Sequence, residues 1–145
     1  MIVANFKANG SSSFILKWHE EFIQAASENI FSSVGVAPSN IHFYKLNKLF
    51  KETSVRLGMQ NIDEEGGART GSISAEMASE IGCSFIILGH SERRIFYSES
   101  NNNIKNKIQL SIKNDVTPIL CIGETLEENE LGKTKDCLLY TSDAA

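Results

Sequence analysis

The segment Phe85-Ile86-Ile87-Leu88-Gly89-His90-Ser91-Glu92-Arg93-Arg94 changes abruptly from apolar residues to a glycine and then to polar and charged residues. A strand that is apolar on both faces is typical of a parallel sheet covered by helices. Gly89 permits a tight bend directly after the last apolar residue. The segment therefore predicts a buried parallel strand with His90 at its carboxyl end.

Outward from this segment, strand-like runs alternate with longer stretches of helical periodicity. The other expected strands are Ile2–Asn5, Val34–Ala37, 55–59 and 117–122. The expected helices are 14–28, 40–51, 75–81 and Asn101–Lys113. Strand–helix alternation at intervals of roughly thirty residues predicts βαβ units with right-handed crossovers and a parallel sheet. This pattern alone fits an open sheet or a barrel, although residues 5–10 lack the G-x-G-x-x-G of a dinucleotide-binding sheet.

The bulk properties are those of an ordinary globular domain and exclude several function classes. The 145 residues are 41% hydrophobic and 22% charged, with a net charge of −4. A negative net charge without a basic run argues against a nucleic-acid or anionic-membrane surface. No apolar run reaches the roughly 18 residues that a membrane-spanning helix needs.

The cysteines favour a reduced compartment. Cys83, Cys121 and Cys137 are odd in number and lack C-x-x-C spacing, which argues against a disulfide framework or a zinc site. The sequence begins directly with a strand-like run, so we expect no signal peptide. We therefore predict a cytoplasmic protein.

Polar residues follow three expected strands at the edge where parallel α/β folds carry their chemistry. Lys7 is either a solvated lysine or a fixed cation that faces an anionic substrate, with Asn5 as an amide partner. His90 is either a structural histidine or a hydrogen-bond donor to a substrate carbonyl, because a helical turn capped by Ser91 would disfavour imidazolium. Glu124 is either catalytic or, as we favour, the residue that fixes a neighbouring loop through backbone amides.

Five motifs occur together and in order: Val3-Ala4-Asn5-Phe6-Lys7, Gly58-Met59-Gln60-Asn61, Gly67-Ala68-Arg69-Thr70-Gly71, the segment 89–94 and Cys121-Ile122-Gly123-Glu124-Thr125. In this order and spacing the chain resembles the triosephosphate isomerase family over about its first 134 residues. The resemblance implies an incomplete (β/α)8 barrel of about five parallel strands with intervening helices.

The resemblance also implies a reaction and assigns roles. Family members interconvert dihydroxyacetone phosphate and glyceraldehyde 3-phosphate, in glycolysis and gluconeogenesis, without a metal or an organic cofactor. By resemblance Asn5 and Lys7 contact the substrate, and Lys7 offsets its negative charge. His90, as a neutral imidazole, polarises the carbonyl and moves a proton between the substrate oxygens. Glu92 organises the pocket beside Lys7, and Cys121 packs near the catalytic base.

The long polar segment 60–74 contains no expected helix or strand. A loop of this length is usually either functional or disordered. Taken alone it reads as a mobile surface loop. In the family the corresponding loop inserts into a partner subunit, with the residue that matches Thr70 reaching the neighbouring active site, so the resemblance predicts a homodimer.

Parts of the family pattern do not occur in these residues. The family's base, a glutamate at the end of a sixth strand, has no match, and neither do its closing lid and its phosphate-binding glycines. A (β/α)8 barrel typically has about 250 residues. Residues 135–145 depart from the family pattern, and we expect them to be foreign sequence.

We expect this polypeptide alone to be loosely folded or prone to aggregation, and inactive as an isomerase. One alternative is a non-catalytic half-barrel module that a second chain complements. Another is a different phosphate-handling barrel enzyme such as an aldolase. The strands offer no convincing Schiff-base lysine or metal ligands for that chemistry.

Overall fold

The computed structural model describes residues 1–143, in which five parallel strands form one curled sheet that is half of a barrel. The strands are β1 (Ile2–Asn5), β2 (Val34–Ala37), β3 (Arg56–Met59), β4 (Phe85–Leu88) and β5 (Thr117–Leu120). They lie side by side in sequence order, and each pairs in parallel with the next. This arrangement confirms the predicted incomplete (β/α)8 barrel, because an open doubly wound sheet reverses its strand order at a switch point.

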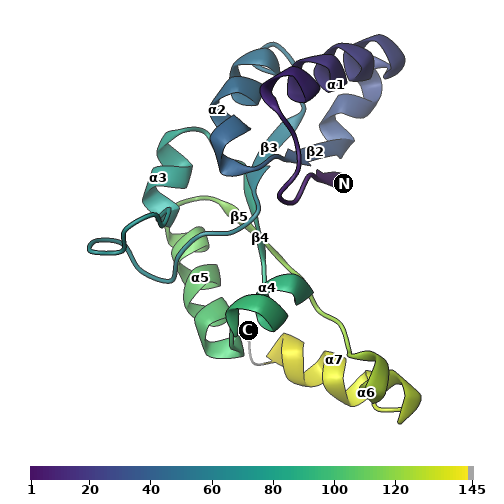
Figure 1. Ribbon diagram of the computed structural model, residues 1–145, viewed down its shortest axis with the longest axis vertical. Coiled ribbons are helices and arrows are strands. Elements are labelled where there is room, and N and C mark those ends of the chain that lie inside the picture. Colours follow the sequence, from purple (N-terminus) through teal and green to yellow (C-terminus); the bar gives the residue numbers. More distant parts are fainter. Residues whose placement is uncertain (144–145) are drawn as a thin grey trace.

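Helices follow the strands, and α2 and α5 pack directly against the sheet. The longer ones are α1 (Ser12–Ala25), α2 (Asn40–Leu49), α5 (Asn101–Lys113) and α7 (Thr134–Asp143). The shorter ones are the 3-10 helix η1 (Glu28–Ser33), α3 (Ala75–Glu80), α4 (Ser91–Tyr97) and α6 (Leu126–Glu130). Figure 1 shows α1 and α2 at one end of the molecule and α4 to α7 at the other.

Side-chain caps fix where several helices begin. The Ser11 hydroxyl accepts the N–H of Phe14, and α1 therefore starts at Ser12, ahead of the predicted start at residue 14. The Ser100 hydroxyl accepts the N–H of Asn103, and the Asn103 side chain accepts the N–H of Ser100 in return. This reciprocal capping box starts α5 at the predicted residue.

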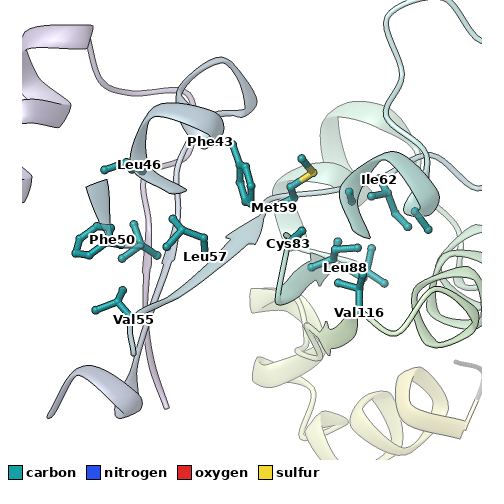
Figure 2. Packing of buried hydrophobic residues seen from close by; sticks show 14 of the residues in the cluster. Phe43, Leu46, Phe50, Val55, Leu57, Met59, Ile62, Cys83, Leu88 and Val116 are labelled. Carbon is teal, nitrogen blue, oxygen red and sulfur yellow. The ribbon is translucent and has the colours of Figure 1, made fainter. Parts of the chain in front are cut away.

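The main hydrophobic core lies between the outer face of the sheet and its helices. Figure 2 shows Phe43, Leu46 and Phe50 packed toward Leu57 of β3, while Leu88 and Val116 lie on the far side of Met59. Every residue of β4 is buried, as its uniformly apolar sequence predicted. The strand that leads to His90 is therefore packed on both faces.

Phe85 occupies the inner face of the sheet, where it covers two glycines of neighbouring strands. A Cβ at Gly58 would lie 2.3 Å from its ring, and a Cβ at Gly35 would lie 2.9 Å from it. Phe85 clusters there with Ala37 and Ile87. Small residues on β2 and β3 thus make room for one large ring that fixes β4 from inside the half-barrel.

The last part of the described chain folds as α6 and α7, which pack against each other. The Cys137 thiol donates to the carbonyl of Gly123 at 3.6 Å, and the Thr141 hydroxyl donates to the carbonyl of Cys137 at 2.9 Å. Residues 135–143, for which we predicted a departure from the family pattern, are therefore helical. Residues 144 and 145 lie outside the described residues.

Across residues 1–143 no helix combines the length and the apolar character needed to cross a membrane.

Candidate active site

The carboxyl ends of β1, β3 and β4 contribute to one cavity of about 640 Å³. Asn5, Lys7, Gln60, His90 and Glu92 are among the residues that line it. The sequence placed Asn5, Lys7, His90 and Glu92 at strand ends, and the structure brings all of them to this cavity. Parallel strands direct their carboxyl ends to one edge, so residues far apart in the chain meet there.

His90 follows β4 and caps the helix that comes next. Gly89, with a φ of +70°, turns the chain between them, and a Cβ there would meet Ile104 at 2.9 Å. We expected Ser91 to cap α4, but Ser91 is its first residue, and His90 is the cap. The Nδ1 atom of His90 accepts the N–H of Glu92 at 3.2 Å. The imidazole ring accepts the backbone N–H that a serine hydroxyl often accepts at the start of a helix. The prediction of Ser91 as the cap was therefore wrong.

This hydrogen bond fixes which ring nitrogen carries the proton. A nitrogen that accepts an N–H cannot itself be protonated, so the neutral imidazole carries its proton on Nε2. The Glu92 carboxylate also lies 3.4 Å from Nδ1, a contact that becomes an ion pair only if the ring is protonated.

Lys7 forms an ion pair with Glu92 across the cavity edge. Its Nζ atom lies 2.7 Å from Oε1 of Glu92. The hydrogen bond from Lys7, with its positive charge, holds the pKa of the Glu92 carboxyl below its usual range. A carboxylate stabilised in this way is a weak base, which suits a residue that positions Lys7.

Gln60 is a site residue whose role the sequence did not reveal. Lys7 has a φ of +52°, a left-handed conformation that side chains other than glycine rarely adopt. The Gln60 side-chain amide donates to the carbonyl of Lys7 and to that of Ala37, each at 2.9 Å. The side chain of the residue directly after β3 thus links the ends of β1 and β2. The strained backbone that carries the Lys7 ammonium is held in place by this bridge.

A buried ion cluster lines the cavity and joins α4 to α5. Glu99 and Lys107 are both buried, and the Lys107 ammonium donates to Oε1 of Glu99 and, at 3.1 Å, to Asn61. Arg93 donates to the same Glu99 oxygen at 3.3 Å. Since the N–H of Arg93 also donates to the carbonyl of His90 at 2.8 Å, this cluster supports the turn that carries the histidine.

The sequence model of the family described as "Triosephosphate isomerase" matches residues 1–145. The chain belongs to the triosephosphate isomerase family.

Individual triosephosphate isomerases agree with this assignment over nearly the whole chain. The protein of Methylococcus capsulatus is 39% identical over 135 residues, which are 92% of this chain and 54% of the relative. That of Chlamydia muridarum is 38% identical over 140 residues, 95% of this chain and 52% of the relative. That of Dictyoglomus thermophilum is 36% identical over 139 residues, which are 95% of this chain and 56% of the relative. The chain spans about half the length of the curated relatives it matches.

Two more residues singled out by the resemblance to triosephosphate isomerase lie away from the ion pair. Cys121 directly follows β5, donates its N–H to the carbonyl of Leu88 at 2.8 Å, and packs against the inner cluster around Phe85. Burial raises the pKa of its thiol, so the thiol is held in its neutral form. Thr70 is exposed in the loop between β3 and α3. Its predicted role at a partner's active site stays a prediction.

Glu124 takes part in a local cluster after β5. Its Oε1 atom accepts from the Asn129 side chain at 2.9 Å and from the Thr134 hydroxyl at 3.4 Å. It fixes the α6 region, as expected of a structural carboxylate, although it does so through side chains and not through the backbone amides that we predicted.

Proposed function

We propose that residues 1–134 supply the electrophilic half of a triosephosphate isomerase active site. The reaction is the interconversion of dihydroxyacetone phosphate and glyceraldehyde 3-phosphate. The observation that carries this proposal is the hydrogen bond from the Glu92 N–H to Nδ1 of His90, because it leaves a proton on Nε2. An imidazole N–H of fixed tautomer is the donor that an enediolate-forming reaction requires.

In the proposed reaction His90 acts on the substrate oxygens. Its Nε2–H donates to the carbonyl oxygen and stabilises the negative charge that develops there when a base removes the proton from the adjacent carbon. The same nitrogen then passes a proton between the two oxygens. Gly89 and the Glu92 N–H hold the ring in place for both steps.

Asn5 and Lys7 hold the substrate in the same proposal. The Lys7 ammonium supplies positive charge for the phosphate ester and for the developing enediolate, and Asn5 supplies an amide. Asn5 also positions Lys7, since its Oδ1 atom accepts the N–H of Lys7 at 3.0 Å. Glu92 orients the Lys7 ammonium and does not act as the base, because its pKa is low.

The base of the proposed reaction comes from a sixth strand, as the family resemblance implies. The carboxylates that line the cavity are Asp63, Glu64, Glu92 and Glu99, and each of them has a cationic partner within 4 Å. A carboxylate that is engaged in an ion pair is not free to accept the substrate proton. We therefore propose that residues 1–145 on their own are inactive.

The proposed enzyme is a cytoplasmic homodimer that uses no metal or organic cofactor. Thr70 in the exposed 60–74 loop is the proposed contact with the partner's active site. Cys121 is proposed to pack beside the base.

A chimera tests this function. Residues 1–134 are joined to the remaining carboxyl-terminal part of the Methylococcus capsulatus relative and assayed with both triose phosphates in a host that lacks its own isomerase. We expect interconversion that the His90→Gln variant loses. A chimera that is folded by circular dichroism and binds an enediolate analogue, yet is inactive, would refute the proposal.

A second candidate function is a non-catalytic half-barrel that a separate polypeptide complements. It is favoured by the two edges of the sheet, because within residues 1–143 β1 and β5 each pair with a single strand. Co-purification of the native chain with a polypeptide that carries the missing strands would support it. Recovery of one continuous reading frame would remove it.

A further inference from the structure

Arg69 gathers three carboxylates of the 60–74 loop around one guanidinium. Its Nη2 atom lies 2.7 Å from Glu65, and its Nη1 atom lies 3.4 Å from Asp63 and 3.9 Å from Glu64. Figure 1 shows this loop between β3 and α3, projecting beyond the helices. The three carboxylates of this projecting loop are therefore all held by one side chain of the same loop, Arg69.

The backbone of the loop closes around the same residues. The N–H of Asp63 donates to the carbonyl of Ile73 at 2.8 Å, and the Asp63 carboxylate accepts from the Ser72 hydroxyl. The N–H of Ser72 donates to the carbonyl of Arg69 at 3.0 Å, which forms a turn around Thr70. Asp63 thus closes the base of the loop, and Arg69 carries the turn at its tip.

The loop is also fixed to the body of the protein. Glu64 accepts from the Asn103 side chain, in the first turn of α5, at 2.7 Å. Glu64 therefore links Arg69 in the loop to a helix that packs on the sheet. Through these contacts the Arg69 guanidinium connects the tip of the loop, its base at Asp63, and Glu64, which is bound to α5.

We propose that Arg69 is a positioning residue that holds the 60–74 loop closed and so presents Thr70, preformed, to a second copy of this chain. The inference rests on the homodimer of the proposed function, and it adds what shapes the docking loop before contact. A loop that is already ordered loses less conformational entropy on association.

We call the Arg69 guanidinium together with the carboxylates of Asp63, Glu64 and Glu65 the clamp. Its strength comes from the attraction between these charges. Individual exposed ion pairs contribute little, but the removal of Arg69 leaves three carboxylates in one place without a counter-charge. Their mutual repulsion would push the base and the tip of the loop apart. Neutralising one of them should then restore part of the closure, which loss of packing alone would not predict.

Hydrogen exchange of the 145-residue chain tests the clamp. In Arg69→Met we expect the amides of Asp63 and Ser72 to exchange about tenfold faster, with the β4 amides unchanged. Adding Glu65→Gln to this variant should slow the exchange again. Lys17→Met, which removes the exposed Lys17–Glu21 pair on α1, is the matched control and should change neither amide.

Several outcomes overturn the clamp. They are wild-type loop amides that exchange as fast as in an unstructured peptide, an Arg69→Met variant that exchanges like the wild type, and a double variant whose amides exchange as fast as those of Arg69→Met.

Sedimentation of the same proteins then tests the docking role. We expect the wild type to self-associate and Arg69→Met to do so about tenfold more weakly. A wild type that stays monomeric overturns the docking role and the proposed homodimer, whereas the exchange result decides the clamp independently.

Discussion

At the scale of single residues, His90 combines two roles in one ring. Its Nδ1 atom completes the first turn of α4, and this structural bond decides the protonation of the opposite nitrogen. In the proposed function a helix cap and a hydrogen-bond donor to substrate are therefore the same side chain. Most replacements change both roles, but a residue that can still accept the Glu92 N–H keeps the cap and removes only the imidazole.

The first prediction concerns His90 in the chimera. His90→Asn retains a side-chain oxygen that can accept the Glu92 N–H, but it is shorter and has no imidazole N–H. We expect the unfolding temperature to change little and kcat to fall by roughly 10²- to 10⁴-fold, the range of general acid–base catalysis. His19→Gln, on α1, is the control and should retain activity. Equal activity of His90→Asn and the wild type would contradict the role.

The second prediction concerns the Lys7–Glu92 pair. Because Lys7 lowers the pKa of Glu92, the pair stabilises the fold above the ordinary glutamate pKa, and this contribution is lost as the pH falls through the lowered value. In Lys7→Met the Glu92 carboxyl should titrate at a higher pH, which carboxyl NMR measures directly. Lys17→Met should leave that titration unchanged. An unshifted Glu92 in Lys7→Met would show that the ion pair does not form in solution.

The third prediction concerns Gln60. Gln60→Met keeps the length of the side chain and removes both N–H bonds to the carbonyls of Lys7 and Ala37. Leaving two carbonyls unpaired should lower the free energy of unfolding by about 1–3 kcal/mol. It should also reduce the activity of the chimera, because Lys7 loses its support. Asn47→Leu removes one amide–carbonyl bond far from the cavity and should affect stability only. Gln60→Met with full activity would contradict the positioning role.

The sequence was sufficient to place Asn5, Lys7, His90 and Glu92 at one edge, because parallel strands bring their carboxyl ends together. It was insufficient for Gln60, since the need for that side chain arises only from the positive φ of Lys7. It also gave the wrong cap for α4. A serine is the common cap, and nothing in the sequence shows that the histidine ring turns back on the helix.

At the scale of elements, the strands were predictable and some ends were not. β1, β2 and β4 have the expected bounds, whereas β5 ends at Leu120 and not at residue 122. The strand pattern continues in sequence, but Leu120 is the last residue paired with β4. The 3-10 helix η1 was missed because its polar, serine-containing sequence resembles a loop.

The fourth prediction concerns the packing of β4 on β3. Gly58→Ala places a methyl group 2.3 Å from the Phe85 ring, so the ring or the strand must move. We expect a loss of about 1–3 kcal/mol in unfolding free energy, typical of overpacking. Gly123→Ala, whose Cβ would meet nothing within 4 Å, is the matched control and should be neutral or slightly stabilising. Denaturant titrations followed by Trp18 fluorescence compare the two. Equal stabilities would show that Phe85 does not fill the inner face.

At the scale of the whole molecule, the sheet curves but does not close within the described residues. The inner residues of β4 and β5 face the space that the opposite strands fill in a complete barrel. Sequence alternation could not distinguish a barrel from an open sheet. The consecutive parallel pairings from β1 to β5 make that distinction.

The fifth prediction is that the 145-residue polypeptide binds a triose phosphate analogue weakly and does not interconvert the substrates, whereas the chimera does. The cavity holds the proposed electrophile and cation, but its four carboxylates are each paired with Lys7, Arg69 or Lys107. Polarising a carbonyl without removing the neighbouring proton leaves most of the barrier in place. Proton exchange of the bound substrate with deuterated water detects that removal even when turnover is too slow to follow. Deuterium incorporation by the 145-residue chain, abolished by His90→Gln, would mean that one of the paired carboxylates can act as the base after all.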